Sequence, residues 1–315
     1  MTRSDVCALL RKNDNFVLLT HRRPDGDTIG SAAALCRALR ALGKTAFVLD
    51  NEQFTPRFAP YLEGLVCKEI PENAFVAAVD IASESLLSFD ALALGAMPVL
   101  AIDHHGGNSL PCEKLVEADK AACGEIIFAL IHELGISLDK AMAEALYVAV
   151  STDTGCVKYA NETANTLHTA AELVDAGADI APINRVFFDT RSLSRLKLEA
   201  RLTEHMEFYA DGLVGLCVLP QSWLDELQIT EDDIDSISGF ARSVEGVEIG
   251  ITIREVEGGA GKLSIRTGSA YDAAAFCAQL GGGGHAGAAG ASVPGGIEAA
   301  KKEILRVLRE SGLEL

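Results

Sequence analysis

The sequence predicts an α/β protein with a parallel sheet, followed by a smaller α/β domain. In the first half of the 315-residue chain, three short apolar runs each end in histidine or aspartate and are separated by helical patterns. This alternation of strand, helix and strand favours parallel pairing. After about residue 207 a hairpin signal and alternating apolar and polar residues indicate antiparallel strands instead.

Composition predicts a globular cytoplasmic protein that does not bind membranes. Hydrophobic residues make up 49% of the chain and charged residues 23%, and no stretch approaches eighteen apolar residues without a charge. The first five residues lack the apolar core of a signal peptide. The eight cysteines are scattered without a C-x-x-C pair, which argues against a disulfide framework and against a structural zinc site.

The net charge of −18 limits the partners that the protein can attract. A protein that binds long nucleic acid is normally basic, so we expect no long duplex DNA partner. A short oligonucleotide or a nucleotide phosphate, captured locally by metal ions or a few cations, suits this charge better. A homodimer is compatible with these bounds.

The first strand, loop and helix are predicted at the start of the chain. Residues 16–20 form a β-prone run that ends at His21, and the loop that follows contains Pro24-Asp25-Gly26-Asp27. A helical pattern runs from Ile29 to Gly43, which is a natural end for a helix. Residues 45–49 are predicted to form the next strand.

Two further strands are predicted to end in acidic residues. Residues 75–79 lead to Asp80, and residues 98–102 lead to Asp103-His104-His105. Helical patterns at 121–135 and 139–151 then lead to Asp153. Sites in open α/β sheets lie beyond the carboxyl ends of the strands, so we expect one group of candidate ligands to converge there: His21, Asp25, Asp27, Asp80, His104 and Asp153.

These ligand types favour a pair of divalent ions. Two histidines and four carboxylates suit ions such as Mn²⁺, with Mg²⁺ or Co²⁺ as substitutes, and are too rich in oxygen for a structural zinc. Six ligands exceed what one open catalytic ion uses, so we expect two Mn²⁺ ions with a water between them. The competing interpretation is that Asp25 and Asp27 are turn residues and that Asp80 caps a helix. Arg22 and Arg23 in the same loop are candidates for a phosphate contact, and the competing interpretation, which we favour, is that they are solvated loop arginines.

The rest of the chain is predicted to form a helical connection and a second domain. Residues 161–206 are almost wholly helical in pattern, so we expect a first domain at 1–190, a helical linker at 191–208 and a second domain at 209–315. Within the second domain we expect a hairpin around Asp211-Gly212, two alternating strands and two helices, in these segments: 207–209, 213–219, 248–254, 262–267, 271–279 and 296–310.

The motifs together resemble those of a known superfamily. His21-x-x-Pro24-Asp25-x-Asp27, Val79-Asp80, Asp103-His104-His105 and Thr152-Asp153-Thr154-Gly155 look like the four motifs of the DHH phosphoesterases. Residues 263–267 and 281–290 resemble the DHHA1 substrate-binding domain. The length and domain order are most similar to the bacterial nanoRNase/pAp-phosphatase group, the bifunctional oligoribonucleases.

The resemblance implies roles for these residues and an active site in the cleft between the domains. His21 and Asp25 would hold the first ion, and Asp27, His104 and Asp153 the second, with Asp80 bridging. Asp103 would orient His104, and His105 would face the substrate phosphate or the leaving oxygen. The catalytic residues would then be His105, Asp80 and Asp103.

The glycine-rich segment of the second domain is predicted to bind an anion. Gly282 to Gly287 formally match G-x-G-x-x-G, but a helical pattern precedes them where a dinucleotide-binding fold requires a strand. We expect a nest of amide donors instead, with a side-chain donor and a bidentate phosphate clamp added to it. The predicted substrate-binding residues are Arg266, Gly283, Gly284 and His285.

These features predict a phosphohydrolase of short nucleotides. We expect it to degrade short oligoribonucleotides to mononucleotides, to remove the 3′-phosphate of adenosine 3′,5′-bisphosphate (pAp), or both. The alternatives are a phosphodiesterase of pApA or cyclic dinucleotides, a manganese pyrophosphatase, and a nucleotide sensor without catalytic activity.

Overall fold

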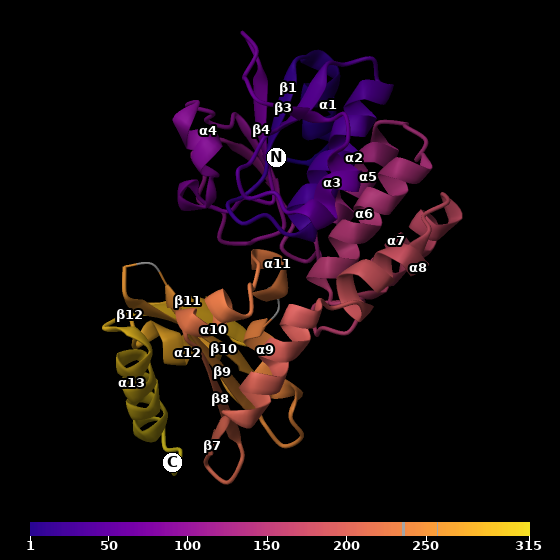
Figure 1. The fold of residues 1–315 in the computed structure, drawn as a ribbon. Coiled ribbons are helices and arrows are strands. Elements are labelled where there is room, and N and C mark those ends of the chain that lie inside the picture. Colours follow the sequence, from indigo (N-terminus) through magenta and orange to yellow (C-terminus); the bar gives the residue numbers. More distant parts are fainter. Residues whose placement is uncertain (235–236, 257) are drawn as a thin grey trace. The chain divides into compact units, whose positions relative to one another are not determined.

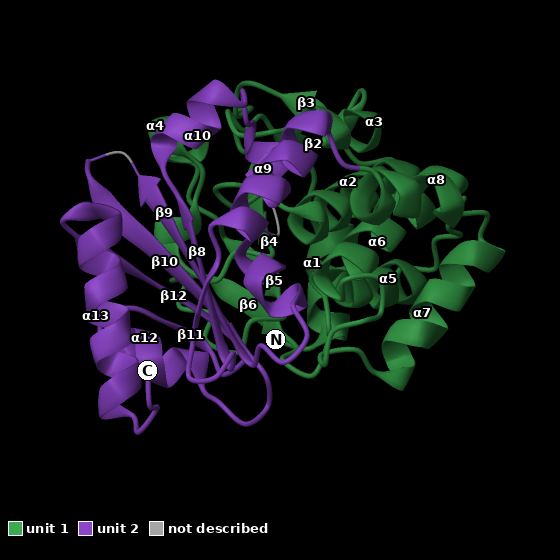
Figure 2. Cartoon of the chain, turned by 60° about the horizontal axis from the view of Figure 1, so that its bottom comes forward, with its two compact units in different colours: residues 1–190 green, residues 191–315 purple. Residues whose placement is uncertain are grey.

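The computed structural model describes residues 1–234, 237–256 and 258–315 (Figure 1). The chain divides into two compact units, residues 1–190 and 191–315 (Figure 2). In the described part of the chain, no helix combines the length and the apolar character needed to cross a membrane.

The first unit is built on a six-stranded, wholly parallel sheet with the order β3-β2-β1-β4-β5-β6. This confirms the predicted parallel sheet. The order reverses between β1 and β4, so connections leave these two strands in opposite directions and open a crevice at their carboxyl ends. The strands are β1 (Phe16–Leu19), β2 (Ala46–Leu49), β3 (Val66–Cys67), β4 (Phe75–Val79), β5 (Leu100–Asp103) and β6 (Glu113–Val116).

Helices cover the two faces of this sheet unequally. α2 (Gly26–Ala41) and α5 (Cys123–Glu133) pack on one face, and α6 (Lys140–Asp153) packs on both of these helices. The other face is covered by a thinner layer that includes α4 (Phe89–Ala93). Alternate strand residues enter the two layers: Leu18 lies in the first core and Val17 in the second. Four further α-helices belong to this unit: α1 (Arg3–Lys12), α3 (Ala59–Leu62), α7 (Ala164–Asp175) and α8 (Ile180–Asn184).

The second unit begins with α9 (Leu193–Glu204), whose Leu198 and Leu202 pack against the strand β8. The sheet has the order β11-β12-β10-β9-β8-β7 and is antiparallel except between β8 and β9. Its strands are β7 (Glu207–Tyr209), β8 (Val214–Leu219), β9 (Ile249–Val256), β10 (Ala260–Thr267), β11 (Gly283–His285) and β12 (Ala288–Pro294).

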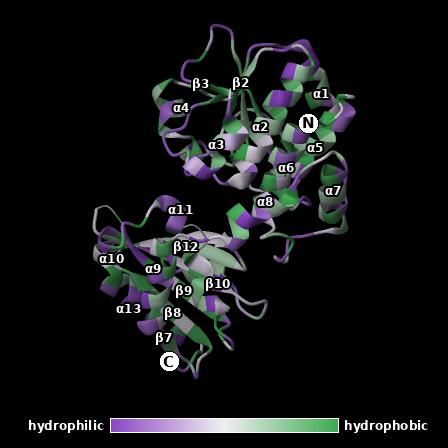
Figure 3. Ribbon diagram, turned by 45° about the vertical axis from the view of Figure 1, so that its right-hand side comes forward, coloured by the Kyte–Doolittle hydropathy of each residue, from purple (hydrophilic) through white to green (hydrophobic). Residues whose placement is uncertain are grey.

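The helices of the second unit also lie on both faces of its sheet. α12 (Ala273–Ala278) and α13 (Gly296–Glu310) share one core with β9, β10 and β12, while α9 and α10 (Gln221–Glu226) cover the other face. α13 is amphipathic and carries both hydrophobic and hydrophilic residues in Figure 3. Its buried side chains include Ile304 and Leu308, which are spaced four residues apart on one helical face. α11 (Glu231–Ile234) is a single short turn.

Close contact between α2 and α6 depends on Gly30. A Cβ atom at this position would lie 2.2 Å from the carbonyl oxygen of Ala145 and 2.9 Å from the backbone nitrogen of Ala149. Backbone atoms cannot move aside as a flexible side chain can. Because Asp25 and Asp27 lie at the start of α2 and Asp153 at the end of α6, this contact sets the spacing of three candidate ligands.

Gly30→Ala is therefore expected to lower the free energy of unfolding by about 1–3 kcal/mol through overpacking. Urea unfolding in the presence of EDTA measures the change without a contribution from bound metal. Gly239→Ala is the control, because a Cβ atom at Gly239 would meet no atom within 4 Å. Equal stability of the two variants would contradict the packing role of Gly30.

Candidate active site

The first group of candidate ligands lies where β1 and β4 end. His21 Nε2 is 3.4 Å from Asp25 Oδ1 and 3.7 Å from Asp80 Oδ2. His21 follows β1, Asp25 is the N-cap of α2, and Asp80 follows β4. One ligand atom from each residue lies within 4.8 Å of the others, so the three side chains could hold a single ion.

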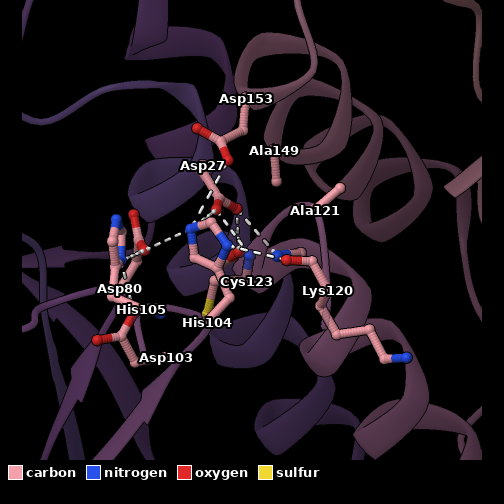
Figure 4. Close-up of polar contacts among 12 residues, drawn as sticks. Asp27, Asp80, Asp103, His104, His105, Lys120, Ala121, Cys123, Ala149 and Asp153 are labelled. Carbon is pink, nitrogen blue, oxygen red and sulfur yellow. Dashed lines mark hydrogen bonds and ion pairs between the residues drawn. The ribbon is translucent and has the colours of Figure 1, made fainter. Parts of the chain in front are cut away.

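The second group is centred on His104 (Figure 4). His104 Nε2 is 3.8 Å from Asp27 Oδ2 and 3.6 Å from Asp153 Oδ2. These residues come from the loop after β5, the start of α2 and the last turn of α6. Their ligand atoms also lie within 4.8 Å of one another.

Asp80 stands between the two groups. Its Oδ2 faces His21, while its Oδ1 is 3.6 Å from His104 Nε2. Oδ1 is buried and accepts no hydrogen bond from the described residues. The backbone of Asp80 has a φ of +58°, a left-handed conformation that aspartate tolerates better than most side chains. His105 Nδ1 also lies 3.4 Å from Oδ1. A buried carboxylate with a histidine facing each of its oxygens is suited to bridge two metal ions.

Main-chain carbonyls orient both histidines. The Nδ1 atom of His21 lies 2.9 Å from the carbonyl oxygen of Arg22, and that of His104 lies 3.1 Å from the carbonyl oxygen of Lys120. With Nδ1 as the donor in each ring, Nε2 is left as the free lone pair that faces the carboxylates. These partners could not be predicted from the sequence, because every residue has a main-chain carbonyl and the acceptor therefore leaves no signal in residue identity.

The expected role of Asp103 as the partner of His104 is wrong. Asp103 Oδ1 accepts hydrogen bonds from the backbone nitrogen and from Nδ1 of His105, at 3.0 and 2.9 Å. Its Oδ2 accepts a third from Asn108 Nδ2 at 2.7 Å. The Asp103 side chain is fully buried at the end of β5, within reach of the residue two positions along the chain. It therefore orients His105, whose side chain is 41% exposed.

The competing interpretation of Asp25 and Asp27 as turn and cap residues also holds in part. Asp25 Oδ1 accepts from the backbone nitrogens of Asp27 and Thr28 and so caps α2. Asp27 accepts from the backbone nitrogens of Cys123 and Gly124, at 2.7 and 2.9 Å, at the start of α5. Capping and metal binding are compatible because a carboxylate offers several lone pairs.

Arg266 and His285 lie on one face of the second sheet. Both residues are in register with Ala288, from opposite sides of β12. Residues aligned across neighbouring strands point to the same face, and two strand spacings separate the pair by roughly 10 Å. This face is opposite to the one on which Ile265 and Ala289 join the core with α12 and α13. Arg266 Nη1 donates to the carbonyl oxygen of Ile265.

The predicted glycine nest is replaced by an extended strand. Gly283 and Gly284 belong to β11, the outermost strand, which pairs with β12. A Cβ atom at Gly284 would lie 2.5 Å from the carbonyl oxygen of Ala288, and one at Gly282 would lie 2.1 Å from that of Gly290. Close backbone approach therefore explains these two glycines, whereas a Cβ atom at Gly283 would meet nothing.

Comparison with known proteins identifies both units. Residues 15–150 match the DHH family, N-terminal domain, and residues 215–311 match the DHHA1 domain. The bifunctional oligoribonuclease and PAP phosphatase NrnA of Thermus thermophilus is 34% identical over 303 residues, which cover 93% of this chain and 89% of that relative. The chain belongs to the DHH family.

Two further comparisons agree with this assignment. The bifunctional oligoribonuclease and PAP phosphatase NrnA of Bacillus subtilis is 26% identical over 89% of this DHH protein and 90% of its own length. The crystal structure of an exopolyphosphatase-related protein from Bacteroides fragilis superposes with a TM-score of 0.86 at 24% identity, covering 98% of this chain and 96% of that one. The latter establishes a common fold. The predicted resemblance to the DHH and DHHA1 domains and to the nanoRNase group is confirmed.

The DHH domain concentrates negative charge out of water. Burial raises the pKa of Asp153 to about 7, and the nearby Asp25 and Asp80 carboxylates contribute to the shift. Burial also raises the pKa values of Asp27 and Asp80. Although burial lowers the pKa of His21, the Asp25 carboxylate raises it to about 9. Without a bound cation, the DHH domain must keep protons on these groups.

The side chains present fit a pair of divalent ions. Two imidazole nitrogens and four carboxylates converge from five segments of the DHH domain, and Asp80 of the first group also lies 3.6 Å from His104 of the second. This mixture suits a cation of intermediate hardness such as Mn²⁺. Divalent ions would replace the protons that burial favours, and they would satisfy Oδ1 of Asp80.

Metal-free protein is expected to lose stability as the pH rises from about 4 to about 7. The pKa of Asp153 is raised in the folded state, so the folded state binds more protons than the unfolded state across this interval. Asp153→Asn should therefore raise the melting temperature of the metal-free protein at pH 8 by a few degrees. Mn²⁺ should then stabilise this variant much less than the wild type.

Thermal unfolding in EDTA and in Mn²⁺ measures both effects. Asp211→Asn, at an exposed turn in the second unit, is the control and should behave as the wild type does. A metal-free Asp153→Asn protein that is less stable than the wild type at pH 8 would contradict the charge crowding.

Proposed function

We propose that this chain is a metal-dependent phosphohydrolase. It degrades short oligoribonucleotides to mononucleotides and removes the 3′-phosphate of adenosine 3′,5′-bisphosphate. The observation that carries the proposal is Asp80, which faces a histidine of each ligand group with one oxygen apiece. Full-length similarity to proteins named as oligoribonuclease and PAP phosphatase supports the choice of substrate.

Two divalent ions bound here, Mn²⁺ with Mg²⁺ or Co²⁺ as substitutes, would activate a water nucleophile, polarise the phosphoryl oxygens and neutralise developing charge. His21 and Asp25 would hold the first ion, and Asp27, His104 and Asp153 the second. Asp80 would bind both. The ligands lie at or directly beside the ends of strands and helices, so the regular elements fix the positions of their backbones.

His105 would act as the proton donor to the leaving oxygen. Its Nδ1 is held by Asp103 at 2.9 Å, and its Nε2 forms no hydrogen bond with the described residues. The carboxylates of Asp103 and Asp80 raise the pKa of His105 to about 11, which keeps the ring protonated at neutral pH. The Asp103 and His105 pair resembles other acid–base pairs in which a buried carboxylate fixes the orientation of an imidazole.

The second unit would supply substrate binding. Arg266 is a bidentate donor for a phosphate, and His285 adds a second donor on the same face of the sheet. Gly283 leaves open space beside the unpaired edge of β11, so its backbone can approach a ligand closely. The predicted placement of the active site between the two domains remains a prediction.

The net charge of the chain supports a small substrate, and its cysteines support a cytoplasmic location. A net charge of −18 disfavours long polyanions, so we propose that duplex DNA is not bound. We also propose a cytoplasmic location, because the eight cysteines are scattered without a C-x-x-C pair, a spacing that does not suggest a disulfide framework.

A substrate panel tests this function directly. With Mn²⁺ present, the protein should cleave adenosine 3′,5′-bisphosphate and ribonucleotides of two to five residues much faster than a 24-residue RNA, pyrophosphate or cyclic di-AMP. EDTA should abolish all of these activities. Linear pApA separates oligonucleotide cleavage from removal of a terminal phosphate. Pyrophosphate as the best substrate would contradict the proposal.

The matched variant pair is Asp80→Asn and Asp90→Asn. Asp80→Asn keeps the shape of the side chain but removes the bridging charge, so kcat should fall by about a thousandfold or more. Asp90 lies in α4 and belongs to neither ligand group, so its substitution should change kcat little. Activity of Asp80→Asn near the wild-type level, or activity that survives EDTA, would contradict the two-metal mechanism.

A further inference from the structure

Arg22 is held in place by an aromatic ring beside the metal centre. Its guanidinium carbon lies 4.0 Å from the ring centroid of Phe89, the first residue of α4. Arg22 is half-buried and Phe89 is 53% exposed. A guanidinium over an aromatic face is attracted to the ring and keeps its N–H groups directed outward in the plane.

The Arg22 side chain has no polar partner among the residues that the structure describes. In the described part of the chain it forms neither a hydrogen bond nor an ion pair, and its Nε is buried without an acceptor. Three other half-buried arginines of the same unit do have polar partners, although the Nε atom of one of them, Arg37, is also buried without an acceptor. Arg3 pairs with the carboxylate of Glu117, while Arg37 and Arg40 donate to main-chain carbonyl oxygens. Arg22 is therefore a positioned cation without a counter-charge, in a chain whose net charge is −18.

The backbone ties Arg22 to both the metal centre and α4. Its nitrogen donates to the carbonyl oxygen of Leu86 at 2.6 Å, and its own carbonyl oxygen orients His21. His21 also forms an antiparallel bridge with Leu87. These backbone contacts thus link three side chains: the guanidinium of Arg22, the ring of Phe89 and the imidazole of His21. Such preorganisation lowers the entropy lost when a ligand binds.

We propose that Arg22, held on Phe89, binds the substrate phosphate that is not being hydrolysed. In adenosine 3′,5′-bisphosphate this is the 5′-phosphate, and in an oligonucleotide it is the neighbouring phosphate. The proposal rests on the proposed function and names one determinant of its substrate specificity. Consecutive Cα atoms are about 3.8 Å apart, so Arg22 and the metal ligand His21 can serve two groups of a single nucleotide. A guanidinium matches a phosphate with two parallel hydrogen bonds.

The neighbouring arginine, Arg23, lacks the features that suit Arg22 to bind a phosphate. It is exposed, has a φ of +53°, and its backbone nitrogen donates to Gln53 Oε1. The interpretation as a solvated loop arginine therefore fits Arg23, whereas for Arg22 we favour the alternative of a phosphate contact. The neighbouring residue supplies a matched control with the same charge.

The test compares adenosine 3′,5′-bisphosphate with adenosine 3′-monophosphate, which differ only in the 5′-phosphate. The wild type should prefer the bisphosphate, and Arg22→Gln should reduce that preference in kcat/KM by about tenfold or more, mainly through KM. Phe89→Leu should act in the same direction with a smaller effect, because the charge stays but its support is lost. Arg23→Gln should keep the wild-type preference.

Equilibrium binding of 5′-AMP in EDTA separates this inference from the hydrolytic function. Calorimetric titration should show a dissociation constant at least about tenfold higher for Arg22→Gln than for Arg23→Gln. The role of Arg22 alone would be overturned by the following result: the wild type hydrolyses nucleotides, and Arg22→Gln and Arg23→Gln both keep its substrate preference and its affinity for 5′-AMP. Equal losses on the bisphosphate and the monophosphate would overturn it as well. Binding of 5′-AMP that depends on Arg22 in a protein without hydrolytic activity would overturn the proposed function alone.

Discussion

The crowding of carboxylates around Asp80 is the constraint on which the DHH domain depends. Asp27, Asp80 and Asp153 are held close together with burial raising the pKa of each, and Oδ1 of Asp80 accepts no hydrogen bond from the described residues. Such an arrangement is costly unless cations or protons compensate for it. The surrounding fold supplies the rigidity that keeps these side chains together. Divalent cations are the simplest means of satisfying all of them.

The topology of the first sheet explains how residues far apart in the sequence reach one place. β1 and β4 are neighbours at the point where the strand order reverses, so His21 and Asp80 follow adjacent carboxyl ends. The start of α2 and the end of α6 bring three more carboxylates, and Gly30 allows these two helices to approach closely. Asp27 contributes to both stability and function, because its carboxylate accepts a hydrogen bond from the backbone at the start of α5 and also faces His104.

Much of this arrangement was predictable because it depends on residue types that recur at strand ends. The parallel sheet and the convergence of the ligand groups followed from apolar runs that end in histidine or aspartate. The partner of Asp103 was not predictable, since a local hydrogen bond to His105 depends on side-chain rotamers and not on spacing. The extended form of β11 was missed for a similar reason: consecutive glycines permit many conformations, and pairing with β12 selects one of them. The pairing of Arg22 with Phe89 joins residues 67 positions apart and leaves no periodic signal.

The central claim is that Asp80 bridges two ions, and anomalous diffraction from crystals grown with Mn²⁺ tests it most directly. The account predicts two manganese peaks roughly 3.5–4 Å apart, with one oxygen of Asp80 directed at each or one oxygen shared between them. His21 and Asp25 should contact one peak, and Asp27, His104 and Asp153 the other. A single peak, or two peaks with Asp80 outside the coordination of both, would contradict the account.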